Sequence, residues 1–130
     1  MNPELEQARE LLSAAQRDRV TLRILSRDAE SPLESMLFHA QQALEKGLKA
    51  VLVAHGVVFR RTHDLMELLD MATAHGIAVP VARDLLLRLA PYAVEFRYLG
   101  VKAPEVSPDE AESAVQVAME WAASAIGAEP

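Results

Sequence analysis

A short segment of the chain concentrates side chains that are able to bind an anion. Residues 39–49 include His39, Gln42, Lys46 and Lys49, and the chain has only one further lysine. Residues three or four apart are neighbours on a helix, so these four side chains would share roughly one face. Lysines beside amide and imidazole donors are suited to binding a phosphate group.

A second segment, "RRTHDL" at residues 60–65, supplies Arg60, Arg61, His63 and Asp64. It opens a predicted helix, whose N-terminus presents unpaired amide donors and the positive end of the helix dipole. Because the connection from the preceding helix is short, both segments are expected at the same end of a helical bundle. Together they predict an anion site for a phosphate-bearing ligand.

The same residues also have a purely structural interpretation. Glu45 and Lys49 have the spacing of a surface ion pair, worth roughly a few tenths of a kcal/mol. Asp64 would stabilise a helix N-terminus by its position alone. His39 on an amphipathic face is typical of a packed or solvated histidine. The spacing by itself favours these structural roles over an anion site.

A further polar group, Arg97 and Tyr98, interrupts an apolar helical pattern at residues 81–99. Arg97 could bind a phosphate while Tyr98 stacks on a base. The alternative is that Arg97 pairs with a carboxylate and Tyr98 covers the edge of the core. Trp121 lies among alanines, and we expect it to anchor the core or an interface.

Other kinds of chemistry have little support. The four histidines form no HExxH pattern and have no carboxylate at ligand spacing, so we predict no metal site. The chain has no cysteine, which excludes disulfides and thiolate metal sites. It also lacks a GxGxxG, a P-loop and a nucleophile elbow. We therefore predict no cofactor and assign no catalytic residue.

The length of 130 residues predicts a single domain over residues 1–130. A formal net charge of −6 argues against broad affinity for nucleic acid, and no Lys or Arg follows Lys102. No apolar run approaches the roughly 20 residues needed to span a bilayer. The N-terminus is charged from Glu4 and does not resemble a signal peptide. We expect a cytoplasmic protein without membrane contact.

Helical periodicity dominates the chain, which predicts an all-α fold, an up-and-down antiparallel bundle of four to five helices. The first helix begins near Pro3, and residues 17–25 continue it or form a short second helix. Capping patterns predict three helix starts: Ser31, Pro32 and Glu34 for a helix to His55, Thr62 for a helix over 63–75, and Ser107, Pro108 and Glu110 for a last helix to about Ile126. The remaining helix covers 81–99, with a kink at Pro91.

The long helix over residues 31–55 has two apolar faces. One is a leucine-rich stripe that we expect in the core. The other consists mostly of small residues, which would let a second helix approach closely: Met36, Ala43, Gly47 and Ala50. We expect this face to contact a partner, so the sequence predicts a homodimer.

The stretch "HAQQALEKGLKAVLVAHGVVFRRTHDLMELL" resembles the signature of HEPN domains, an "AQQAxEKxLKA" helix followed by a short loop and "THDL". "YAVEFRY", before an acidic loop and the final helix, fits the same pattern. The resemblance covers residues 5–126. It gives a motif position to nine residues: Gln41, Gln42, Glu45, Lys46, Lys49, His63, Asp64, Arg97 and Tyr98.

The resemblance implies an all-α bundle that usually dimerises and often accompanies a minimal nucleotidyltransferase, as a partner chain or a fused domain, in toxin–antitoxin-like pairs. Several HEPN groups are metal-independent ribonucleases in which four to six residues separate an arginine from a following histidine. No histidine here has that spacing, and the nearest match is Arg60 or Arg61 before His63. Our leading hypothesis is a non-catalytic module that binds a nucleotide, another phosphate-bearing ligand or a nucleotidyltransferase. The alternatives are a ribonuclease toxin that uses His63 with Arg60 or Arg61 on RNA, and a purely structural assembly unit.

Overall fold

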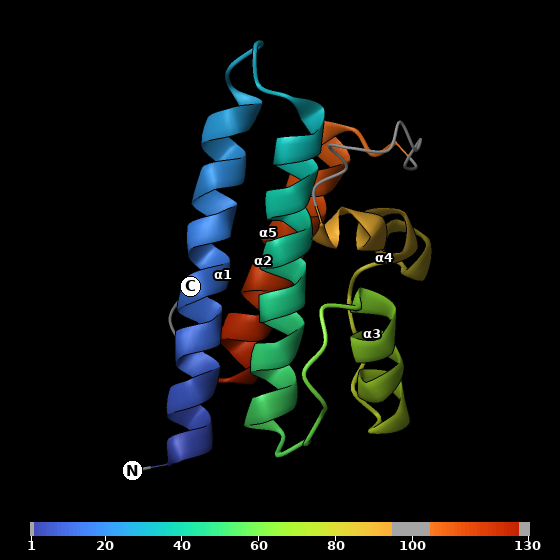
Figure 1. Ribbon diagram of the computed structural model, residues 1–130. Helices are drawn as coiled ribbons and strands as arrows, with labels where there is room; N and C mark the ends of the chain where they lie inside the picture. The colour runs from blue at the N-terminus through green and yellow to red at the C-terminus, as the bar shows by residue number, and fades with distance from the viewer. Residues whose placement is uncertain (1, 95–104, 128–130) are drawn as a thin grey trace.

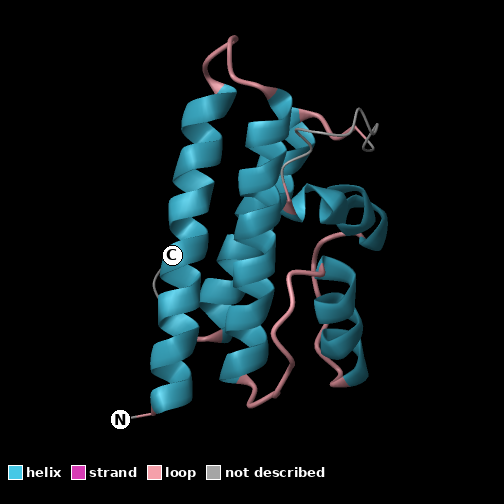
Figure 2. Cartoon of the chain, in the orientation of Figure 1, coloured by secondary structure: helices cyan, strands magenta, loops and turns pink. Residues whose placement is uncertain are grey.

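A computed structural model describes residues 2–94 and 105–127, and every regular element among them is helical (Figure 2). The elements are α1 (Pro3–Ser26), α2 (Leu33–Ala54), α3 (Leu65–Ala74), α4 (Arg83–Leu89), the 3-10 turn η1 (Ala90–Ala93) and α5 (Pro108–Ala125). The predicted all-α bundle is therefore confirmed. Residues 17–25 continue the first helix and do not form a second one.

Helix α2 lies at the centre of the bundle. It packs against α1 and α5 on one side and against α3, α4 and η1 on the other (Figure 1). Helix α1 runs antiparallel to both of its neighbours, and Ser26 near its end hydrogen-bonds Glu112 near the start of α5. Helices α2 and α5 run in the same direction, because α3, α4 and η1 intervene between them in the chain.

The core lies around α2. Buried residues of α1 and α3 recur at helical spacing on one face of each helix, and Trp121 on α5 is partly buried against the core. The small-residue face of α2 is also buried inside this one chain, because α5 covers it. A Cβ added at Gly47 would lie 2.8 Å from Met119 Cε on α5. The expectation that this face is left for a partner helix is therefore wrong.

The N-termini of the helices show which of the predicted capping residues form a cap. Ser107 and Glu110 form the predicted capping box of α5. Ser31 does not cap α2, whose N-cap is Pro32 without a side-chain hydrogen bond. Thr62 does not cap α3, because Asp64 does so instead. Both corrections have the same cause: the helix begins one or two residues later than the pattern suggested, and the expected cap falls outside it.

The predicted helix over 81–99 is interrupted early. Helix α4 ends at Leu89, and Pro91 lies in the 3-10 turn that follows. Proline removes a backbone donor, which favours a break at this position. The remainder of that prediction, including Arg97 and Tyr98, lies outside the described residues.

Candidate functional site

Glu45 lies at the centre of a polar cluster on α2. Its carboxylate is buried, since the residue is only 2% exposed. Its Oε1 accepts a hydrogen bond from Gln41 Nε2 at 3.1 Å, and its Oε2 accepts one from Lys49 Nζ at 3.0 Å. His63 Nδ1 lies 3.0 Å from the same Oε2. Lys49 and His63 therefore meet at a single oxygen. The interpretation of Glu45 and Lys49 as a simple surface ion pair is wrong, because both side chains are largely buried.

The cluster arises from the helical repeat. Gln41, Glu45 and Lys49 are each four residues apart, so they form one row along α2. Gln42 extends the row by donating to Gln41 Oε1 at 2.7 Å. Gln41 Nε2 also donates to the backbone carbonyl of His63 at 3.3 Å. The same row therefore ties the connection between α2 and α3 to the surface of α2.

The environment of Glu45 favours its ionised form. Burial acts to raise its pKa, but hydrogen bonds from His63, Gln41 and Lys49 together outweigh burial and hold the pKa below its usual value. An ionised carboxylate can only accept hydrogen bonds, so His63 presents an N–H at Nδ1. Its Nε2 makes no hydrogen bond to any described residue, and the side chain is 73% exposed.

The arginines of the α2–α3 connection have different surroundings. Arg60 Nε donates to Glu67 Oε1 at 2.6 Å, and this contact raises the pKa of Arg60 and lowers that of Glu67. Arg61 is exposed and has no ion-pair partner in the described part of the chain. Asp64 is occupied, since its Oδ1 accepts from the backbone amides of Met66 and Glu67 as the N-cap of α3. The amides at this helix end are thus already partly satisfied.

A second polar cluster joins α2 to α1. Asp18 on α1 is buried, with His39 Nδ1 2.9 Å from its Oδ1 and Lys46 Nζ donating to its Oδ2 at 2.6 Å. The side chains of His39 and Lys46 are each less than a third exposed. Lys46 directs its positive charge at this internal carboxylate, and the contacts of Lys46 and His39 with Asp18 cross-link α1 and α2.

The structure therefore divides the residues that the sequence placed on one face. Lys49, Gln42 and His63 gather around Glu45 and Gln41. Lys46 and His39 instead contact Asp18 on the side of α1. Each lysine of α2 has its own carboxylate partner.

The sequence patterns did not identify Asp18 as the carboxylate that contacts His39 and Lys46. It occupies the position three residues after Ala15 and four before Leu22, on the apolar stripe of α1. A carboxylate on such a stripe must find a partner, because burying an unpaired charge is costly. That position is the signal that the sequence offered.

Two features are absent from residues 2–94 and 105–127. No group of three or more His, Asp or Glu side chains there is arranged to hold a metal ion. None of the helices in this part of the chain combines the length and the apolar character that a membrane crossing needs.

Comparison with known proteins gave one match. The HEPN domain family model matches residues 8–122, which is most of the chain. No curated protein and no solved structure matches the chain.

Proposed function

This protein belongs to the HEPN domain family, and from that premise we propose that it is a non-catalytic binding module whose α2–α3 connection receives a nucleotide or another phosphate-bearing ligand. The observation that supports this most is the anchoring of His63. Its Nδ1 is held by the buried Glu45, while most of its side chain remains exposed. It lies two residues from Arg61, which has no ion-pair partner among the described residues.

The charges of this region favour an anionic ligand. Lys49 and Glu45 neutralise each other, and Arg60 is engaged by Glu67. Arg61 therefore supplies the available positive charge, and its planar guanidinium suits a phosphate. His63 adds a donor or an acceptor at Nε2, at a position that the Glu45 contact restrains.

The test is calorimetric titration of the full chain with ATP. We expect saturable binding that Arg61→Ala and His63→Ala each weaken by about tenfold, as the loss of one charge-assisted contact implies. Arg83→Ala is the matched control, because Arg83 pairs with Asp70 on another exposed surface. Equal binding by all variants would refute the assignment of the site.

A partner protein is the second part of the proposal. We propose that the protein associates with a minimal nucleotidyltransferase and forms a homodimer, as the family resemblance implies. Co-purification with a nucleotidyltransferase encoded beside it would support the first association, and light scattering would measure the oligomer. If the protein neither bound a nucleotide nor captured a nucleotidyltransferase, only the alternative of a structural assembly unit would remain.

One observation favours ribonuclease activity as a second candidate. The Glu45–His63 contact orients an imidazole as a carboxylate does in many general-base pairs. His63 Nε2 would take the proton of an RNA 2′-hydroxyl. The oxygen of that hydroxyl would attack the adjacent phosphorus and displace the 5′-oxygen. Arg61 would stabilise the charge on the phosphate.

Cleavage of labelled RNA in the presence of EDTA would establish this activity. It should disappear in His63→Ala and fall in Glu45→Gln, and expression of the unaltered protein should arrest growth. Intact RNA after prolonged incubation, together with normal growth, would exclude it.

A further inference from the structure

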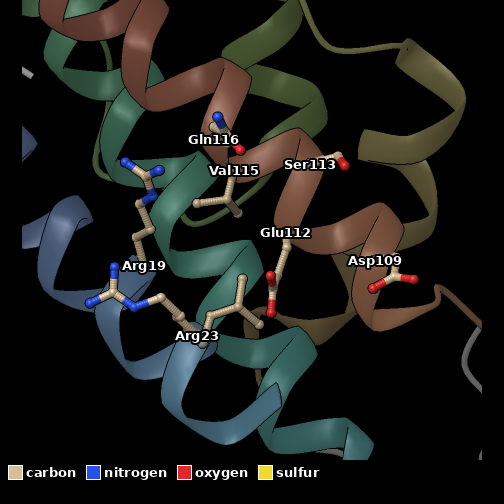
Figure 3. Close-up of a pocket in the computed structure, with 8 residues that line it drawn as sticks. Arg19, Arg23, Asp109, Glu112, Ser113, Val115 and Gln116 are labelled. Atoms are coloured by element: carbon tan, nitrogen blue, oxygen red, sulfur yellow. The ribbon is translucent and has the colours of Figure 1, made fainter. Parts of the chain in front are cut away.

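A cavity of about 290 Å³ lies between the second half of α1 and the first half of α5 (Figure 3). None of the residues that the sequence analysis proposed for a site lines it. Its volume is close to the lower end of the range for small-molecule pockets, about 300 Å³. It shares no residue with the Glu45 cluster, so its role is independent of the function proposed above.

One wall of this α1–α5 cavity carries two arginines. Arg19 and Arg23 are one turn apart on α1 and both extend from that helix at the cavity (Figure 3). Neither makes an ion pair or a side-chain hydrogen bond within the described residues. An anion that contacts both guanidinium groups would gain two charge-assisted hydrogen-bond partners.

The opposite wall carries carboxylates from α5. Glu112 is half-buried and accepts a hydrogen bond from Ser26 at the end of α1, which fixes its position. Asp109 lies one turn earlier and is exposed. Both signs of charge therefore line the cavity, and among the described residues no ion pair joins its arginines to these carboxylates.

The surface between the walls is apolar. Leu22 on α1 and Val115 on α5 both line the cavity, and each residue is only 1% exposed. A ligand that reaches from one charged wall to the other must cross these side chains. Short hydrocarbon segments suit such a crossing, because they bury apolar surface without leaving a polar group unpaired.

We propose that the α1–α5 cavity binds a small zwitterion, with its anionic group on Arg19 and Arg23, its ammonium group on Glu112 and Asp109, and a short hydrocarbon across Leu22 and Val115. A simple anion would meet the carboxylates of α5, and a simple cation would meet the arginines of α1. Only a molecule with both charges satisfies both walls, because like charges at close range are unfavourable.

Linear ω-amino acids of increasing length test the distance between the arginines of α1 and the carboxylates of α5. The probes are β-alanine, 4-aminobutanoate and 6-aminohexanoate, titrated into the full chain and followed by NMR chemical shifts of α1 and α5. We expect one length to bind best. It should bind at least about tenfold more tightly than the carboxylate and the amine of equal chain length, each of which lacks one charge-assisted contact.

Variants assign the two ends of the ligand. We expect the affinity for the best probe to fall by about tenfold in each of Arg19→Gln, Arg23→Gln and Glu112→Gln. Arg23→Lys keeps the charge and should lose less affinity than Arg23→Gln, which separates binding from folding. Thermal unfolding identifies any variant that does not fold. His63→Ala, in the Glu45 cluster, should leave this binding unchanged.

Three results would overturn the proposal. The first is a carboxylate or an amine alone binding as tightly as the best ω-amino acid. The second is the absence of saturable shifts with every probe up to about 10 mM, where binding is too weak to be specific. The third is binding that survives unchanged in Arg19→Gln, Arg23→Gln and Glu112→Gln while all three variants fold.

Discussion

At the scale of single residues, the ionised Glu45 links acidity to the stability of the bundle. Burial acts to raise its pKa, and the bonds from His63, Gln41 and Lys49 lower the pKa by more than burial raises it. A carboxyl group whose pKa is lower in the folded than in the unfolded protein stabilises the fold at pH values above its unfolded pKa. That contribution is lost as the pH falls through the folded pKa.

Glu45→Gln should lower the free energy of unfolding by about 3 kcal/mol near pH 7, because Lys49 then stays largely buried without an anion. The penalty should shrink as the pH falls below 4.5, the ordinary value for this carboxyl, because the unfolded chain then takes up a proton first. It should be smallest once the pH is also below the lowered pKa of Glu45 in the folded protein. Urea denaturation of both proteins across this pH range measures the difference.

The double variant Glu45→Gln with Lys49→Met tests the mechanism. Replacing both charges removes the uncompensated cation, so the double variant should be more stable than Glu45→Gln alone. A penalty for Glu45→Gln that does not change with pH, or one that the second substitution fails to reduce, would show that the charge is not responsible.

At the scale of helices, the two serine caps proposed from the sequence make a matched pair. Ser107 Oγ accepts from the Glu110 amide, and the Ser107 amide donates to Glu110 Oε1, whereas Ser31 lies outside α2. Ser107→Ala should therefore cost about 1 kcal/mol of stability, and Ser31→Ala should cost close to none. Thermal unfolding of both variants gives the comparison. Equal losses would mean that α2 begins earlier than the structure shows.

At Gly47 there is little space between α2 and α5, because an added Cβ would lie 2.8 Å from Met119 Cε. Gly47→Ala should change stability by less than about 1 kcal/mol, because the gain in helix propensity offsets a small shift of the flexible Met119 end. Gly47→Leu should cost more than about 2 kcal/mol, since α5 must then move. Chemical denaturation distinguishes the two. A tolerated leucine would indicate that α5 does not cover this face in solution.

At the scale of the whole molecule, stability should be highest along α2 and lowest in α4. The middle of α2 is almost fully buried, because helices pack against it on both sides. Helix α4 has seven residues, and Leu87 within it is 56% exposed. Segments with few buried apolar contacts open at lower free energy than the core.

Native-state amide hydrogen exchange should therefore show the slowest exchange in the middle of α2, at the free energy of global unfolding. Amides of α4 should exchange through a local opening that costs less. The amides of α5 provide an internal reference, because that helix packs against both α1 and α2. Equal protection of α2 and α4 would show that the bundle opens as a single unit.

The sequence by itself determined the helical class, the family resemblance and the Ser107 cap of α5. These features rest on local patterns, since apolar periodicity and capping act between residues three to seven positions apart. The pair formed by Glu45 and Lys49 was also visible in the spacing. Its burial was not, because spacing does not reveal which side of a helix a neighbour covers.

Only the tertiary structure decided which charges meet. Lys46 and His39 pair with Asp18 on another helix, and His63 joins Glu45 across the α2–α3 connection. Helix α5 covers the face that the sequence left for a partner. The physical reason is that each of these outcomes depends on how the helices are rotated and packed against one another. That arrangement is set by the burial of the whole core, to which residues distant in the chain contribute jointly.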